Sequence, residues 1–292
     1  MEGIILRGIG SFYSVEAPDG AVYTVRPQGK LKHMRMKPKI GDAVEFVPGS
    51  KDEDGWLSAI LPRKNELVRP PVANIDLLLI VVPAAHPNPD LLLIDQLLFT
   101  ARKAAIPVRL IVNKSDLAPE VAESITEAYR SADVDPVAVS AYTGAGIDAL
   151  RDSLAGKTYA LAGQSGIGKT TLINALNGFD LETGDLSEKI ERGKHTTRRV
   201  ELLHGAGGSK VLDTPGFSLI ETELMPPEAL EKLYPEFLPF LGNCRFTPCA
   251  HIAEPDCAVK DAVKSGAISS ERYERYILLY NEMKERWSRR YD

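Results

Sequence analysis

A glycine-rich stretch between two regular elements is the feature that most constrains how this chain can fold. Its members are Gly163, Gln164, Ser165, Gly166, Ile167, Gly168, Lys169 and Thr170. They fit the pattern G-x-x-x-x-G-K-[ST], whose glycines let backbone N–H groups curl around phosphates. The run 158–162 predicts a strand before the stretch, and the spacing of 171–176 predicts a helix that directs its N-terminus at the same phosphates. The sequence therefore predicts an α/β domain that binds a nucleoside triphosphate.

Two further motifs indicate which base is bound. The first is the tetrad Asn113, Lys114, Ser115 and Asp116. It follows the apolar run 108–112, so we expect it at the carboxyl end of a buried strand, where ligands of open α/β sheets bind. A carboxylate there accepts hydrogen bonds from guanine, whereas adenine would present an acceptor to it. The tetrad alone could be an ordinary surface turn, but the pair Ser140 and Ala141 follows another strand-like run, 136–139, and favours GTP over ATP.

The order of these motifs predicts a circular permutation. In most GTPases the phosphate loop comes before the guanine motif, whereas here the tetrad precedes the loop by about fifty residues. The stretch 213–216, Asp-Thr-Pro-Gly, then follows the strand-like run 210–212. Asp213 would hold Mg²⁺ through water, and the Gly216 N–H would contact the γ-phosphate. The chain beyond residue 216 is therefore tethered to the element that moves on hydrolysis.

The catalytic water needs a partner that the usual position does not supply. Phe217 stands where many GTPases carry a glutamine, and phenylalanine cannot orient water. The polar region 179–193 predicts a mobile loop that orders around a γ-phosphate. Thr196 or Thr197 would complete the Mg²⁺ shell that Thr170 begins. His195 beside them could orient or deprotonate water, but these residues alone equally allow a solvated loop histidine or an RNA contact.

The chain's three cysteines and one of its five histidines predict a metal site. These residues are Cys244, Cys249, His251 and Cys257. Such tight clustering in a cytosolic chain indicates a metal and not disulfides. Three thiolates and one imidazole complete a tetrahedral structural Zn²⁺ site with no open position for catalysis. The alternative is three buried free cysteines beside a surface histidine.

The N-terminal residues 1–67 predict a small all-β barrel. Five short alternating runs, joined in one place by the turn 18–20, suit a Greek-key barrel of the OB type, which often binds oligonucleotides. Between two of these runs lie five basic residues, namely Lys30, Lys32, Arg35, Lys37 and Lys39. A basic loop is usually just solvated, but on an OB barrel it favours contact with RNA phosphates.

The rest of the chain predicts two more domains. Residues 68–220 form the nucleotide domain, and residues 221–292 form a mostly α zinc-binding domain. Its final helix starts near Ser269 or Ser270, and an aromatic stripe from Tyr273 to Trp287 indicates packing more than base stacking. The sequence has no apolar run of membrane-spanning length and no signal peptide, so we expect a cytoplasmic protein. A net charge of −5 means that RNA binding must rely on local patches.

Together these features closely resemble one family, the ribosome small-subunit-dependent GTPase A family of bacteria. The resemblance spans nearly the whole chain and includes the loop 163–170, the switch 193–198, the stretch 213–217 and the cysteine knot 244–257. It implies a factor that acts late in assembly of the small ribosomal subunit, and we expect that factor to be a monomer although no motif determines the oligomeric state. Such a factor binds the particle and its rRNA with GTP, hydrolyses the nucleotide on contact and leaves with GDP. In that family the switch histidine is the favoured catalytic residue, which points to His195.

The predicted GTP site therefore comprises the tetrad, the Ser140–Ala141 pair, the phosphate loop, Thr171, Asp213 and Gly216. An alternative function is a GTP-gated RNA-binding translation regulator in which hydrolysis is incidental. Stimulation of turnover by small subunits separates the two, because a mere binder would show none.

Overall fold

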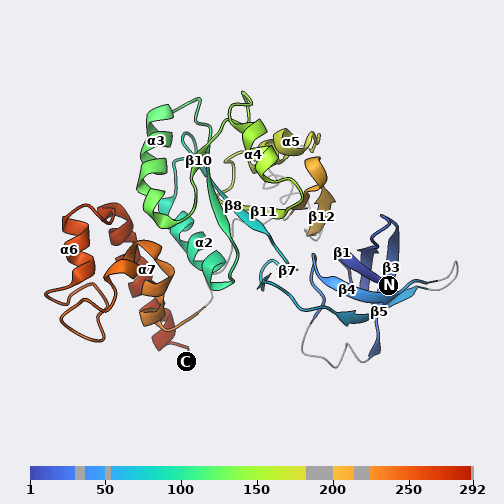
Figure 1. The fold of residues 1–292 in the computed structure, drawn as a ribbon, viewed down its shortest axis with the longest axis horizontal. Helices are drawn as coiled ribbons and strands as arrows, with labels where there is room; N and C mark the ends of the chain where they lie inside the picture. The colour runs from blue at the N-terminus through green and yellow to red at the C-terminus, as the bar shows by residue number, and fades with distance from the viewer. Residues whose placement is uncertain (30–36, 50–53, 182–199, 214–223, 291–292) are drawn as a thin grey trace, which may run out of the picture.

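The computed structural model describes residues 1–29, 37–49, 54–181, 200–213 and 224–290. Figure 1 shows an N-terminal barrel in blue and a C-terminal helical module in orange and red, at opposite ends of a central α/β unit. This order of β, α/β and mostly helical parts confirms the predicted fold class.

The N-terminal barrel closes on itself. Its strands are β1 (Glu2–Ile9), β2 (Phe12–Glu16), β3 (Val22–Pro27), β4 (Ala43–Val47) and β5 (Gly55–Ile60). They pair in the order β1-β2-β3-β5-β4, and β4 returns to β1. Alternating residues such as Ile5, Val25 and Leu57 point inward and are fully buried. The predicted turn lies between β2 and β3, where Gly20 has a φ of +84° and the Asp19 carboxylate accepts from the Ala21 N–H.

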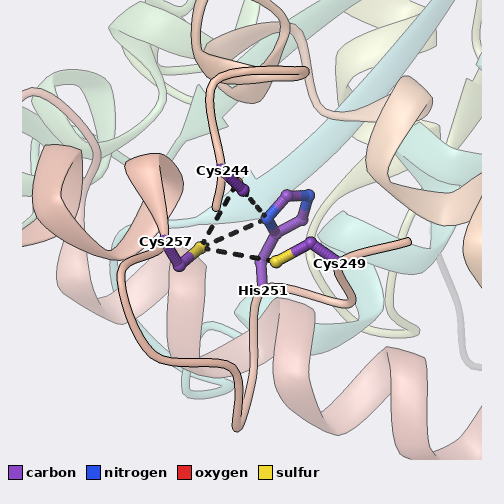
Figure 2. A group of neighbouring side chains, drawn as sticks. All are labelled: Cys244, Cys249, His251 and Cys257. Carbon is purple, nitrogen blue, oxygen red and sulfur yellow. Dashed lines mark hydrogen bonds between the residues drawn. The ribbon is translucent and has the colours of Figure 1, made fainter. Parts of the chain in front are cut away.

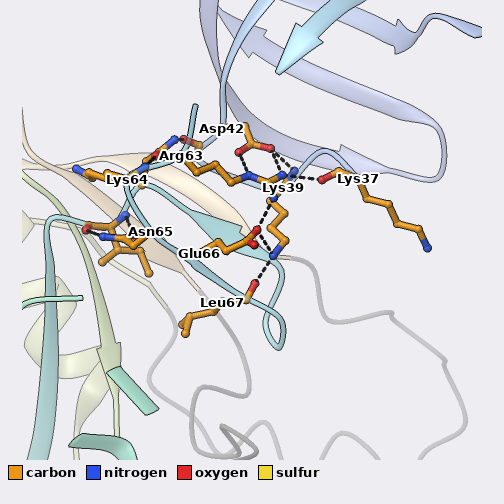
Figure 3. A network of polar contacts seen from close by, with 11 residues as sticks. Lys37, Lys39, Asp42, Arg63, Lys64, Asn65, Glu66 and Leu67 are labelled. Carbon is orange, nitrogen blue, oxygen red and sulfur yellow. Dashed lines mark hydrogen bonds and ion pairs between the residues drawn. The ribbon is translucent and has the colours of Figure 1, made fainter. Parts of the chain in front are cut away.

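A polar network fastens the barrel to the connection that follows it (Figure 3). The connection contains the short strands β6 (Glu66–Leu67) and β7 (Val72–Ala73). Arg63 binds the fully buried Asp42 through two nitrogens, at 2.7 and 2.8 Å. Lys39 donates to Glu66 at 2.6 Å and to the Leu67 carbonyl at 2.8 Å. Asp42 of the barrel thus pairs with a cation of the connection, and Glu66 of the connection pairs with a cation of the barrel.

The central unit is a mixed sheet with helices on both faces. Its elements are β8 (Leu77–Pro83), α2 (Leu91–Lys103), β9 (Val108–Asn113), α3 (Pro119–Ala128), η1 (Arg130–Ala132), β10 (Val137–Ala138), α4 (Ile147–Ser153), β11 (Thr158–Ala162), α5 (Lys169–Asn177), β12 (Glu201–His204), η3 (Ala206–Gly208) and β13 (Lys210–Asp213). The strand order is β10-β9-β8-β11-β13-β12, and only β12 runs antiparallel to its neighbour.

Strand β8 shows why this sheet is central. All seven of its residues are buried, and alternate side chains enter two different cores. Leu78 and Ile80 pack in the core that contains α2 and α3, whereas Leu79 and Val81 pack in the core that contains α4 and α5. A strand covered on both faces has to be continuously apolar, as the sequence is here.

The barrel sheet continues into the central sheet. Strand β1 pairs with β12 through Arg7 and Glu201. Beside this pair, Glu16 of the barrel accepts from Lys210 of β13 at 2.9 Å and lies 2.6 Å from His204 of β12. Burial alone would raise the pKa of Glu16, but the contacts with Lys210 and His204 lower it. The barrel is therefore attached to the hairpin that ends at Asp213.

The C-terminal module packs against α2. Its elements are the 3₁₀ helices η4 (Pro227–Leu233) and η5 (Pro235–Phe240) and the helices α6 (Ala258–Lys264) and α7 (Ser270–Ser288). Helix α7 begins at the predicted place, because the Ser269 hydroxyl accepts from the Arg272 N–H. Tyr276 and Met283 of the predicted stripe are buried in a core that also contains Phe99 of α2. Among the described residues no helix is long and apolar enough to cross a membrane.

Candidate functional site

The topology brings three predicted motifs to one edge of the sheet. Strands β9, β10 and β11 are parallel, and the tetrad, the Ser140–Ala141 pair and the phosphate loop each follow the carboxyl end of one of them. Strand β13 is parallel to β11 and ends at Asp213, whose backbone therefore reaches the same edge. This edge is where open α/β sheets bind ligands.

The phosphate loop has the backbone that its glycines predict. Gly163 has a φ of +143°, and a Cβ there would lie 2.3 Å from the Val81 carbonyl oxygen. Gly168 has a φ of +88°, and a Cβ there would lie 2.9 Å from the Asn113 amide nitrogen. Only glycine fits either position without displacing a neighbour. Helix α5 starts immediately afterwards, so that its free N–H groups face the loop.

Lys169 lies folded into this loop. Its ammonium donates to the carbonyls of Gly163, at 2.7 Å, and Gln164, at 2.5 Å. Burial lowers the pKa of Lys169 to about 8. A cation that is desolvated and faces only neutral carbonyls gains strongly from an arriving phosphate. The lysine is thus placed for the β and γ oxygens of a nucleotide.

Asn113 joins the three motifs directly. Its amide nitrogen donates to the Ile167 carbonyl at 2.9 Å, and its amide oxygen accepts from the Ala141 N–H at 3.1 Å. The residue is 2% exposed, so both bonds are shielded from water. Ser115 also links the tetrad to the segment that carries Ser140 and Ala141, because its hydroxyl donates to the Val139 carbonyl at 2.9 Å. Ser140 is fully buried and accepts from the Thr143 N–H.

A cavity of about 380 Å³ lies between these motifs. Its lining residues are Asn113, Lys114, Asp116, Leu117, Ser140, Ala141, Tyr142, Gly168 and Thr171. The Lys114 side chain crosses toward the phosphate loop and donates to the Gly166 carbonyl at 3.2 Å and to the His86 carbonyl. The exposed Asp116 lines the same space, where it can read the edge of a base.

Leu117 and Tyr142 were missed by sequence reasoning. Each directly follows a recognised motif, and that adjacency was the available signal. Tyr142 is 91% exposed although it lines the cavity. An aromatic ring at such a rim can cover the face of a bound base.

For most of the other predicted site residues the structure gives only the degree of burial, or does not describe them. In the phosphate loop Ile167 is buried, Ser165 and Gly166 are exposed, and Thr170 is half-buried at the start of α5. Others lie outside the described residues, namely His195, Thr196, Thr197, Gly216, Phe217, Lys30, Lys32 and Arg35. Of the basic barrel residues that are described, Lys37 is exposed, whereas the Lys39 ammonium is held by Glu66 and the Leu67 carbonyl.

The four predicted metal ligands converge (Figure 2). Their ligand atoms all lie within 4.8 Å of one another. The Cys257 sulfur is 3.8 Å from each of the other two sulfurs and 3.3 Å from the His251 Nδ1. Burial raises the pKa of Cys249 and of Cys257, so thiolates in this place need a cation beside them. The donor set and its spacing fit one tetrahedral ion of the zinc type.

Residues outside the ligand set hold the metal loop in shape. The Tyr273 hydroxyl donates to the His251 carbonyl at 2.6 Å, and the Tyr276 hydroxyl donates to the Ala250 carbonyl at 3.0 Å. The Glu254 carboxylate accepts from the N–H groups of Ala250 and Ile252. The loop therefore depends on α7 as well as on its own sequence.

Comparison with known proteins agrees with this geometry. The family model for RsgA GTPase matches residues 60–223, and the model for the RsgA N-terminal domain matches residues 2–57. The chain belongs to the RsgA GTPase family. Membership implies GTP hydrolysis, and it confirms the resemblance found in the motifs.

Relatives of the family are similar over nearly their whole length. A protein from Ruminiclostridium cellulolyticum, named small ribosomal subunit biogenesis GTPase RsgA, is 44% identical, over 97% of this chain and 94% of its own. A protein of the same name from Caldanaerobacter subterraneus subsp. tengcongensis is 42% identical, over 100% of this chain and 98% of its own.

Two solved structures of the family have the same architecture. YjeQ from Thermotoga maritima is 33% identical, with a TM-score of 0.82, over 97% of this chain and 98% of that one. YloQ, described as a circularly permuted GTPase, is 30% identical, with a TM-score of 0.79, over 98% of this chain and 95% of that one. The permuted GTPase fold predicted from motif order is therefore confirmed.

Proposed function

We propose that this chain hydrolyses GTP during late maturation of the small ribosomal subunit, which it binds through the subunit's rRNA in the triphosphate state and leaves as the GDP form. The observation that carries the proposal is the cavity in which Asn113 bonds both the phosphate loop and Ala141. A guanine nucleotide would set its base against the Asp116 carboxylate and its phosphates against the phosphate loop. The names of the relatives supply the ribosomal step.

The proposal divides the chain into three functional parts. Residues 1–67 would contact rRNA, with Lys37 as the exposed basic residue among those described. Residues 68–220 would bind and hydrolyse GTP. Residues 221–292 would hold one structural Zn²⁺ and complete the surface that meets the subunit. We propose a monomer that acts in the cytoplasm.

The residues of the GTP site have distinct tasks. Lys169 binds the β and γ oxygens, and the Gly216 N–H contacts the γ-phosphate. Thr170, Asp213 and either Thr196 or Thr197 hold the Mg²⁺, which neutralises charge that develops on the phosphates. His195 orients the attacking water, because Phe217 cannot.

Hydrolysis would be slow until the subunit orders the segment that carries His195. General acid–base groups contribute about 10²–10⁴-fold to rates, so stimulation of that order is expected. The test is GTP turnover with and without purified small subunits. A GTP-gated regulator with incidental hydrolysis would show equal turnover in both, and that result would refute the proposal.

His195→Ala separates binding from hydrolysis. The variant should bind GTP normally and dock on the small subunit, yet hydrolyse poorly and remain bound. Full subunit-stimulated turnover in this variant would assign the water to a ribosomal group. GTP affinity, measured on the same preparation, is the control for folding of the site.

A further inference from the structure

The imidazole of His251 contacts different groups at its two nitrogens. Its Nδ1 lies 3.3 Å from the Cys257 sulfur and 3.6 Å from the Cys244 sulfur. Its Nε2 lies 2.8 Å from a carboxylate oxygen of Glu231. The His251 side chain is 3% exposed and that of Glu231 is 23% exposed. One nitrogen therefore faces the metal ligands, and the other faces a carboxylate outside the ligand set.

This arrangement decides which nitrogen can bind a metal. A carboxylate at Nε2 favours the tautomer that carries its proton there, which leaves the Nδ1 lone pair free for the ion. Such carboxylates also fix the ring's orientation and raise its basicity as a ligand. The Tyr273 hydroxyl holds the backbone of His251, the Phe237 ring packs edge-on against the imidazole, and Glu231 is the polar partner of its Nε2.

Glu231 lies on the part of the chain that follows the strand ending at Asp213. It belongs to η4, which is the first described element after β13, the strand that ends at Asp213. The carboxyl end of η4, close to Glu231, is fastened to the central unit, because Arg102 of α2 donates to the Leu233 carbonyl at 2.7 Å. Leu230 anchors its apolar side in the module's core, and Pro227 of the same element is buried as well. The metal cluster thus contacts the element that receives the chain from the nucleotide site.

We propose that Glu231 is a positioning residue for the metal and that, through it, metal occupancy fixes η4 at the entry to the C-terminal module. The proposal rests on the structural metal site proposed above. It adds a carboxylate to that site and gives the metal a second task, which is to hold the connection that leaves the γ-phosphate-sensing segment.

Zinc release from the full-length protein tests whether Glu231 is a positioning residue for the metal. Glu231→Gln keeps an acceptor but loses the charge, and Glu231→Ala loses both. Outer-shell changes of this kind weaken metal affinity by about 10–100-fold, so release to a chromophoric chelator should be fastest for the alanine variant and intermediate for glutamine. Glu228→Gln is the matched control, because Glu228 lies on the same element and is exposed. It should release zinc as the unchanged protein does.

Hydrogen exchange of residues 224–233 tests whether metal occupancy fixes η4 through Glu231. Removing zinc from the unchanged protein should speed exchange of these amides. In Glu231→Ala they should already exchange fast with zinc bound, and removal should add little. GTP affinity should be equal in all the variants.

The outcomes distinguish the two proposals. An unchanged protein that holds no zinc would overturn the metal site itself. One zinc per chain, with release from Glu231→Ala and Glu231→Gln as slow as from the control, would overturn the role of Glu231 alone. Exchange in 224–233 that responds equally to zinc in Glu231→Ala and in the unchanged protein would overturn the coupling to η4.

Discussion

Arg272 of α7 forms an ion pair with Asp95 of α2, and each of these side chains is only 1% exposed. The same guanidinium donates to Glu236 of η5 at 2.5 Å, and Arg275 donates to the second oxygen of Asp95. The Arg272 guanidinium also lies 4.7 Å from the centre of the Tyr129 ring. A desolvated charge network therefore joins the C-terminal module to the central unit.

This network attaches the C-terminal module to the central unit at a second place, in addition to the covalent connection whose position the motif order predicts. The module is tethered through the chain that follows residue 216, and it is also fixed to α2. The loop before α2 contains His86, whose carbonyl accepts from Lys114 of the guanine tetrad. The module thus contacts a helix whose preceding loop contacts Lys114, and any movement on hydrolysis has to involve α2 or break the network.

Replacing Asp95 should destabilise this interface strongly. Asp95→Ala leaves the buried guanidinium of Arg272 and the half-buried one of Arg275 without their shared partner, which costs about 3–5 kcal/mol of unfolding free energy. Urea unfolding followed by Trp287 fluorescence measures the effect in a Trp56→Phe background, because the chain has two tryptophans. Glu285→Ala is the control, since the pair of Glu285 with Arg289 is exposed and contributes about 0–1 kcal/mol. Equal stabilities for the two variants would contradict the prediction.

The elements of this fold were largely predictable because their signals are local. The structure has a strand at each of the five barrel runs and before each motif, and α7 begins where the sequence predicts it. The observed bounds differ from the predicted ones by only a few residues. Strand β8 is continuously apolar because both of its faces are covered, which is a local signal of a central strand. The convergence of the four predicted metal ligands was predictable because the first and the last of them are only thirteen residues apart.

What could not be predicted depends on pairs far apart in the chain. Asp95 is a lone acid in an apolar helix, and its partner Arg272 is 177 residues away. The pairing of β1 with β12 and the contact of Glu231 with His251 leave no periodic pattern either. Lys39 belongs to a basic run, yet its partner Glu66 gives it a structural contact that local sequence does not reveal.

Asp116→Asn should change nucleotide choice. The Asp116 carboxylate lines the guanine cavity, and each hydrogen bond to a charged partner is worth about 1.5–3 kcal/mol, so GTP affinity should fall at least about tenfold. Xanthosine triphosphate should bind better than before, because its altered edge suits an amide. Competition against a fluorescent nucleotide measures both. Asp148→Asn, at a residue 87% exposed on α4, should change neither, and unchanged GTP binding in Asp116→Asn would remove this residue from the site.

Nucleotide affinity should fall as pH rises above neutrality. Burial lowers the pKa of Lys169 to about 8 in the free protein, so the neutral amine gains population above that pH. Bound phosphates favour the ammonium and raise its pKa, so binding takes up a proton there, and affinity should fall about fourfold between about pH 7 and about pH 8.5. Lys169→Arg keeps its charge throughout this range and should lose the slope. A flat profile for the unchanged protein would contradict the assigned role of Lys169.

Cys257→Ala should remove zinc and leave GTP binding intact. Cys257 is 1% exposed, its sulfur lies within 3.8 Å of the other three ligand atoms, and alanine offers no ligand atom in its place. Ala141 of the guanine cavity packs against the core of α4 and α5, whereas Cys257 belongs to the core of α7, and these two cores share no buried residue. Metal analysis should give one zinc per chain before the change and none after it.

The same substitution should impair binding to the small subunit. Structural zinc contributes about 10–16 kcal/mol of apparent binding free energy in small domains, and the metal loop has few apolar residues of its own to replace it. Unchanged protein stripped of zinc by a chelator is the control, because it should lose subunit binding to the same extent while it keeps its affinity for GTP. Full zinc occupancy in Cys257→Ala would refute the ligand set, and normal subunit binding without zinc would show that the metal does not shape the docking surface.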